Sequence, residues 1–177
     1  MHMQTKEPEI KSQINIFVDL DETLIHTNTS TEPNEIPEIS INTSTRPGKP
    51  DYYSSSLRPG AIELLAELRR IGNVFMLTRA THEYAVAMNK VFDLGFPVNR
   101  IYSRRDVKNF RYKELNLPQG KNFLIDDLPQ IDNYEKITLI SQLGLVKYIH
   151  IKPFYGFISD VLLASDIENI VGTIKNT

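Results

Sequence analysis

The sequence predicts an α/β fold in which a parallel sheet carries helices on both faces. Short apolar runs alternate along the chain with stretches that repeat apolar residues at helical spacing. This alternation is typical of a parallel sheet with crossover helices. Three of the apolar runs end in acidic or hydroxyl side chains. Because such sheets bind ligands beyond the carboxyl ends of their strands, the residues after each run are the candidate functional positions.

The individual elements follow from local patterns. Residues 14–20 form a continuous apolar run that ends in acids, which is typical of a buried parallel strand. Pro59 suits the first turn of a helix whose apolar residues recur at helical spacing, and Gly72 stands where that helix would end. The same criteria predict further strands over 74–77, 100–103, 122–125 and 145–151, and helices over 81–93 and 157–174.

One stretch departs from this alternation. Residues from about 27 to 57 are rich in Ser, Thr, Pro, Asn and Glu, with a weak alternation of apolar and polar residues over 38–41. This composition predicts a small β-hairpin or flap on the surface rather than a core element. Residues 1–13 are polar and are expected to form a tail, so the predicted domain covers 14–177.

The bulk composition excludes several classes of function. The 177 residues contain no cysteine, which excludes a disulfide framework, a thiolate zinc site and a cysteine nucleophile. The net charge of −2 provides no basic field for nucleic acid or an anionic membrane. No apolar run approaches the roughly 18 residues that span a bilayer, and the first residues do not resemble a signal peptide. We therefore expect an intracellular, cytoplasmic protein, or a nuclear one if the source is eukaryotic.

Four acidic residues stand at two of the strand ends. Asp19 and Asp21 are two positions apart, so on an extended backbone they project to the same side. Asp126 and Asp127 arrive from another strand end and add negative charge. Carboxylates this close repel one another, which implies either a metal ion or a shared proton. Oxygen ligands without a neighbouring His or Cys favour Mg²⁺ over zinc.

This arrangement indicates phosphoryl transfer. With Mg²⁺ offsetting the charge between carboxylates and phosphate, Asp19 would approach phosphorus as a covalent nucleophile. Asp21, if kept protonated, would donate to the leaving oxygen and later accept a proton from the attacking water. Thr78 would bond a phosphate oxygen through its hydroxyl group and a backbone N–H near a helix start.

A lysine is still required to balance the phosphate and the aspartates. Lys113, which lies 13 residues before Asp126, is the leading candidate, and Lys121 and Lys108 are weaker ones. Arg79 is a further candidate ligand for a phosphate or for the backbone of a phosphopeptide.

Five segments resemble the motifs of the haloacid dehalogenase (HAD) superfamily, and among its members the FCP/SCP-type, NLI-interacting-factor-like phosphatases are the most similar. The likeness covers about 14–170. The segments are 19–26 (DLDETLIH), 58–60 (RPG), 78–80 (TRA) with 84–85 (YA) in the helix that follows, 112–115 (YKEL) and 124–129 (LIDDLP). The resemblance implies a HAD-like Rossmannoid parallel sheet with a small β-flap insert and no large cap domain.

The resemblance also implies roles for single residues. Asp19 would be the nucleophile, Asp21 the acid/base, and Thr78 and Lys113 the phosphate ligands. Mg²⁺ would be held by the Asp19 carboxylate, the backbone carbonyl of Asp21 and the fourth motif. The family often has Asp-Asn where this chain has two aspartates at 126–127. Register with the family favours Asp127 as the direct ligand and the broader superfamily favours Asp126, so both are candidates.

The predicted function is Mg²⁺-dependent hydrolysis of phosphomonoesters through a phosphoaspartyl intermediate on Asp19. Lys113 lies only 13 positions before Asp126, which leaves no room for a lid domain between them. An open site suits a large substrate, and a phosphoprotein is the first choice. A nucleotide or a 3′-phosphorylated nucleic-acid end is the alternative, which the lack of basic charge disfavours. A catalytically inactive binding module is the other alternative. The roles of His26 and of Tyr52 and Tyr53 in the flap stay open.

Overall fold

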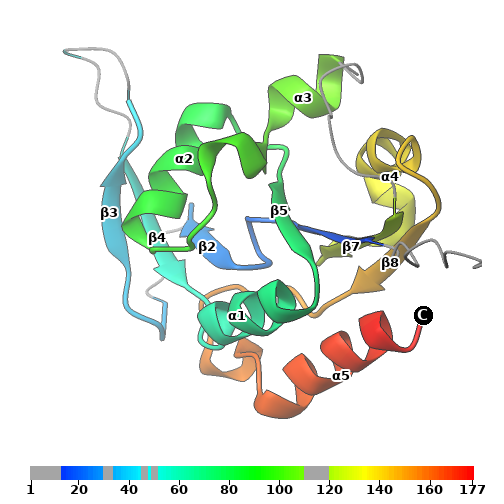
Figure 1. The fold of residues 1–177 in the computed structure, drawn as a ribbon. Coiled ribbons are helices and arrows are strands. Elements are labelled where there is room, and N and C mark those ends of the chain that lie inside the picture. The colour runs from blue at the N-terminus through cyan, green and yellow to red at the C-terminus, as the bar shows by residue number, and fades with distance from the viewer. Residues whose placement is uncertain (1–12, 30–33, 45–47, 49–51, 110–119) are drawn as a thin grey trace, which may run out of the picture.

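A five-stranded parallel sheet forms the centre of the fold (Figure 1). The computed structural model describes residues 13–29, 34–44, 48, 52–109 and 120–177. In spatial order, the strands are β6 (Ile101–Tyr102), β5 (Asn73–Leu77), β1 (Gln13–Val18), β7 (Gly120–Asp126) and β8 (Val146–His150). The chain runs outward from β1 to β5 and β6, then returns to β7 on the other side of β1. The order therefore reverses beside β1, where sheets of this type bind their ligands.

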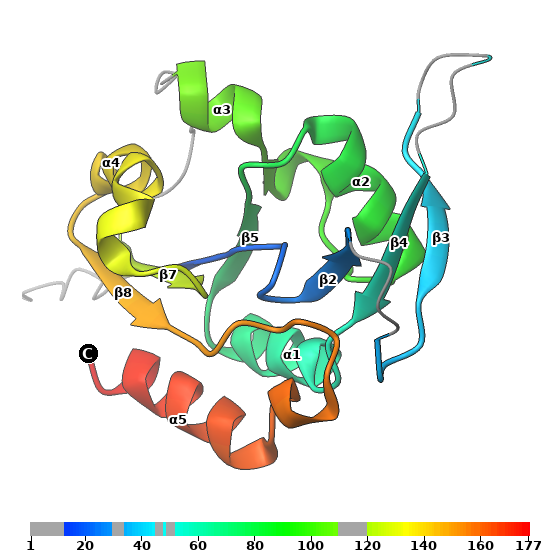
Figure 2. The ribbon, with the colours of Figure 1, turned by 180° about the vertical axis from the view of Figure 1, so that it is seen from behind.

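Helices cover both faces of the sheet, as the sequence predicts (Figures 1 and 2). One face carries α1 (Ala61–Ile71) and α5 (Ala164–Lys175), and the other carries α3 (Arg104–Asn109) and α4 (Tyr134–Ser141). Successive strand residues point to opposite faces. In β1, accordingly, Ile16 and Val18 join the core under α1 and α5, whereas Phe17 joins the core under α3 and α4.

The flap is a second, three-stranded antiparallel sheet. Its order is β2 (Ile25–Asn28), β4 (Tyr52–Leu57) and β3 (Ile39–Asn42). The helix α2 (His82–Val91) lies against β3. The predicted small flap is confirmed in the described part of 27–57, although it contains one strand more than a hairpin. It is also more than a surface excursion, because Ile41 and Ser55 are buried.

One expected boundary needs correction, and two short helices were not expected. The last helix begins at Ala164 rather than at 157, because Ile158–Asp160 is a short 3-10 turn and Asp166 caps the helix by accepting the N–H of Leu163. The helices α3 and α4 were not predicted, since each is only about two turns long and gives a weak periodic pattern. Except for Gln13, the expected polar tail 1–13 lies outside the described residues.

Within the described residues, none of the helices has both the length and the apolar composition to cross a membrane. This agrees with the absence of long apolar runs in the sequence.

Gly60 allows the start of α1 to lie close to the segment that precedes α5. Its φ is +89°, a conformation that glycine adopts without strain. A Cβ at this position would stand 2.4 Å from the carbonyl oxygen of Leu162, whose N–H donates to Pro59 O at 2.9 Å. The two segments approach so closely that only glycine fits.

Gly60→Ala is expected to lower the free energy of unfolding by about 1–3 kcal/mol, the usual cost of a strained backbone position. Gly172→Ala is the matched control, because an added Cβ there meets nothing within 4 Å and helix propensity favours alanine. Urea denaturation of the two variants and the wild type measures both effects. Equal stability of Gly60→Ala and wild type would contradict the close approach.

Candidate active site

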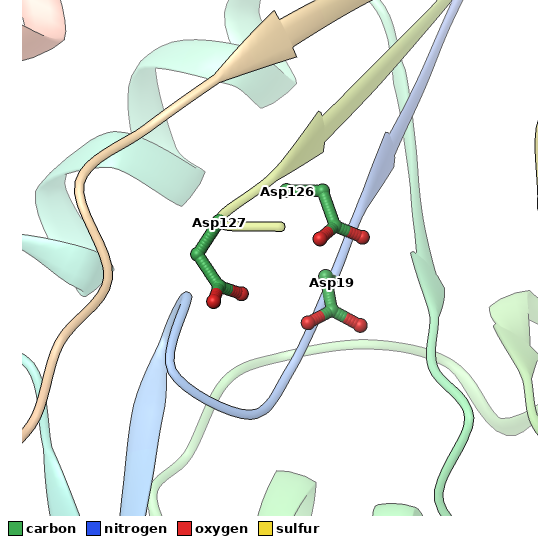
Figure 3. A group of neighbouring side chains, drawn as sticks. All are labelled: Asp19, Asp126 and Asp127. Atoms are coloured by element: carbon green, nitrogen blue, oxygen red, sulfur yellow. The ribbon is translucent and has the colours of Figure 1, made fainter. Parts of the chain in front are cut away.

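Three carboxylates gather beyond the carboxyl ends of β1 and β7 (Figure 3). Asp19 follows β1, Asp126 ends β7 and Asp127 follows it. The strands are neighbours, and the N–H of Asp19 donates to Ile125 O at 3.0 Å. One oxygen from each of the three carboxylates lies within 4.8 Å of the others, and the residues are only 7, 0 and 8% exposed. The predicted convergence of the first and fourth motifs is therefore observed.

A buried lysine lies among these carboxylates. The ammonium group of Lys136 on α4 donates to Asp19 Oδ1 at 2.6 Å and to Asp126 Oδ2 at 2.7 Å, and the residue is 1% exposed. The sequence analysis missed it. Its signal was a lysine in the apolar stripe of a short helix, since Lys136, Leu139 and Ile140 are spaced as one buried helix face.

Of the lysines chosen from the sequence, only Lys121 has a described side chain. Lys113 lies outside the described residues, as does the side chain of Lys108. Lys121 is exposed near the amino end of β7, whereas Asp126 ends that strand at its carboxyl edge. A strand that long separates the two positions, so Lys121 is wrong as a candidate.

The two aspartates of the fourth motif have different contacts. Both oxygens of Asp126 accept hydrogen bonds, Oδ2 from Lys136 and Oδ1 from the N–H of Leu128 at 3.0 Å. Asp127 Oδ1 accepts the Thr23 hydroxyl at 3.0 Å.

Asp21 is engaged by a different residue from those that contact this group. Its Oδ1 accepts a hydrogen bond from the hydroxyl group of Tyr84 on α2 at 2.6 Å. Its side chain is not part of the carboxylate group that could hold a metal ion. Burial raises the pKa of the Tyr84 phenol well above its ordinary value, so the hydroxyl stays protonated and donates.

Thr78 and Arg79 follow β5, the other neighbour of β1. The Thr78 N–H donates to Tyr102 O, and its buried hydroxyl oxygen accepts the N–H of Ala80 at 3.0 Å, which leaves the hydroxyl proton free to donate. The Thr78 N–H is thus used by the sheet. The Arg79 guanidinium donates to Asp132 O and lies 4.0 Å from Glu135, at the start of α4.

The site carries an excess of negative charge. Burial raises the pKa of Asp19 to about 8, against the attraction of Lys136, and the Asp126 charge adds to the rise. Burial also raises the pKa of Asp127. Burial alone would lower the pKa of Lys136, but the attraction of Asp19 and Asp126 outweighs it and raises the pKa. Three carboxylates against one ammonium leave two surplus negative charges when all four are ionised, a donor set that fits a hard divalent cation.

Comparison with solved structures finds the same fold in RNA polymerase II CTD phosphatases. Fission yeast Fcp1 with the substitution R271A, bound to beryllium fluoride, aligns at a TM-score of 0.56 with 16% identity, over 93% of this chain and 50% of that one. A second Fcp1 structure aligns at 0.58 with 17% identity, over 93% and 49%. The chain thus spans about half the length of these structures. The HAD domain of the effector protein Lem4 from Legionella pneumophila aligns at 0.43 with 12% identity, over 80% and 88%.

Curated protein sequences provide no significant match. A family match covers the five motifs and the whole parallel sheet except the first residue of β1. This match extends over residues 14–171, and the chain therefore belongs to the NLI interacting factor-like phosphatases.

Proposed function

We propose that this chain is a Mg²⁺-dependent phosphomonoester hydrolase that forms a phosphoaspartyl intermediate on Asp19. The observation that carries the proposal is the buried group of Asp19, Asp126 and Asp127 with Lys136 at the carboxyl edge of the sheet. Membership in a phosphatase family supports the same reaction class.

Asp19 is the proposed nucleophile because it is the carboxylate that follows the central strand and is oriented by Lys136. Its oxygen forms a bond to phosphorus as the bond from phosphorus to the leaving oxygen breaks. Asp21 donates a proton to that leaving oxygen. Water then attacks the phosphoaspartate, Asp21 accepts its proton, and phosphate leaves with Asp19 restored.

Two residues are proposed to hold the phosphoryl oxygens. Lys136 supplies the positive charge, and Lys113, which the family resemblance implies as a phosphate ligand and which lies outside the described residues, is the second candidate. Thr78 donates through its free hydroxyl proton, since its oxygen accepts from Ala80. Arg79 is proposed to bind the substrate outside the phosphate position, because its guanidinium group contacts Asp132 and Glu135 near the start of α4.

The surplus negative charge supports a divalent cation at the same place. Asp19, the backbone carbonyl of Asp21 and Asp127 would hold Mg²⁺. Asp127 is the preferred ligand from the fourth motif because both oxygens of Asp126 already accept hydrogen bonds. The bound ion would offset charge between the carboxylates and the phosphate.

A phosphoprotein is the proposed substrate, with phosphorylated serine or threonine as the first choice. The similarity of fold to CTD phosphatases supports it, as does the small flap in place of a cap domain within the described residues. Nucleotides and 3′-phosphorylated oligonucleotides are the competing substrates.

Asp19→Asn is expected to lose activity toward p-nitrophenyl phosphate by roughly 10³-fold or more, because the amide cannot attack phosphorus. Undiminished turnover by Asp19→Asn would overturn the mechanism.

Chelation of Mg²⁺ by EDTA should abolish wild-type activity, and added Mg²⁺ should restore it. A panel of phosphopeptides, nucleotides and 3′-phosphorylated oligonucleotides then ranks the substrate classes by kcat/KM.

Lys136→Met is expected to lower kcat by about 10²–10³-fold, the usual effect of removing one group that stabilises transition-state charge. Methionine keeps most of the length of the side chain but removes its charge. Lys113→Ala is the comparison, and its loss of kcat should be the smaller one if Lys136 carries the main charge. The reverse pattern would return the role to Lys113. Thermal unfolding in saturating Mg²⁺ verifies that each variant is folded.

Asp127→Ala is expected to raise the Mg²⁺ concentration for half-maximal activity at least about tenfold, since even outer-shell partners of a metal contribute about 10–100-fold. Asp126→Asn is the comparison. It should mainly lower the stability of the protein, because it breaks a buried ion pair with Lys136. A larger shift in the Mg²⁺ requirement for Asp126→Asn than for Asp127→Ala would reverse the assignment.

A further inference from the structure

A chain of hydroxyl groups joins the flap to Asp21. Ser55 Oγ on β4 lies 2.7 Å from Thr27 Oγ1 on β2, and Thr27 Oγ1 lies 2.5 Å from the hydroxyl oxygen of Tyr84. Tyr84 in turn donates to Asp21 Oδ1 at 2.6 Å. Ser55 and Tyr84 are buried. The flap therefore reaches the side chain of Asp21 through three consecutive hydrogen bonds.

The direction of these hydrogen bonds follows from their number. Each hydroxyl group has one proton to donate. The Tyr84 hydroxyl donates its hydrogen bond to Asp21. The Tyr84 oxygen must therefore accept the hydrogen bond that it shares with Thr27, so the Thr27 hydroxyl is the donor. The Thr27 oxygen must then accept a hydrogen bond from the Ser55 hydroxyl. All three protons point toward Asp21, and Asp21 Oδ1 is the acceptor at the end of the chain.

Tyr84 is also held by its ring. It lies on α2, the helix that packs against β3, and its ring meets that of Tyr53 on β4 edge to face, with 5.1 Å between ring centroids. The hydroxyl of Tyr84 is thus fixed from two sides, by the aromatic contact and by Thr27. A donor that is fixed in this way sets the orientation of the carboxyl group that accepts from it.

We infer that Tyr84 is a positioning residue for Asp21: it occupies Oδ1, so that Oδ2 carries the transferred proton and faces the reacting oxygen. The inference rests on the proposed role of Asp21 as acid and base. Because Tyr84 is held by β2 and β4, the flap then acts on the site through Asp21. It keeps the acid/base in its working orientation.

Leaving-group dependence separates this role from ordinary packing. The leaving group of p-nitrophenyl phosphate departs without a proton, whereas phenyl phosphate and alkyl phosphates need one. The kcat/KM value reports the first transfer of phosphate to Asp19, in which Asp21 is the acid. Hydrolysis of the intermediate, in which Asp21 is the base, contributes to kcat. A loss of packing would lower all of these values together.

The test is Tyr84→Phe, which keeps the ring and removes the hydroxyl. We expect kcat/KM for phenyl phosphate to fall about tenfold or more, part of the roughly 10²–10⁴-fold that general acid catalysis supplies. For p-nitrophenyl phosphate, kcat/KM should change by less than about threefold, while kcat falls and phosphoenzyme accumulates. A uniform loss for all substrates, or no loss, would overturn the inference.

Three further variants keep the outcomes distinct. Thr27→Val should show the same selectivity more weakly, and it replaces Tyr84→Phe as the test if that variant fails to fold. Tyr52→Phe changes an exposed tyrosine of the same flap and should behave as wild type on these small substrates. Asp21→Asn must itself show the selective loss. If Asp21→Asn shows no selective loss, the proposed acid/base role of Asp21 is wrong. If Asp21→Asn shows the selective loss and Tyr84→Phe does not, only the positioning role of Tyr84 is wrong.

Discussion

The burial of four charged groups at one edge of the sheet is the constraint on which the rest of the structure depends. Removing an ion from water costs several kcal/mol, so Asp19 and Asp126 are tolerated because Lys136 lies between them. That lysine is delivered by α4, whose Leu139 and Ile140 pack on the sheet. The three carboxylates still outnumber the one ammonium, and this surplus negative charge suits the edge to a divalent cation.

The four acids have different contacts because different elements of the fold hold them. Asp19, Asp126 and Asp127 are presented by the parallel sheet, where neighbouring strands end together. Asp21 is only two residues from Asp19, yet the chain has already left the sheet there, and its carboxyl group turns to Tyr84. The flap that follows is packed against α2, so the proposed acid/base and the small sheet form one connected unit.

The positions of the strands and of the first and fourth motifs were predictable from local patterns. Continuous apolar runs identified β1, β5 and β7, and the polar residues after each run marked the carboxyl edge. Parallel pairing then requires these residues to converge, which is the arrangement of Asp19 and Asp126. The boundaries were less predictable, as α5 shows, because a single cap from Asp166 decides where that helix begins.

The sequence by itself determined the sheet, its functional edge and the acids on that edge, because these follow from short-range periodicity and the geometry of parallel strands. Only the tertiary structure decided which lysine joins them, which aspartate of the fourth motif is engaged by it, and what holds Asp21. Those contacts link residues 10 to 117 positions apart. A lysine in an apolar helix stripe or a tyrosine in a helix has no local signature for a partner on another element, so its partner is set by packing alone.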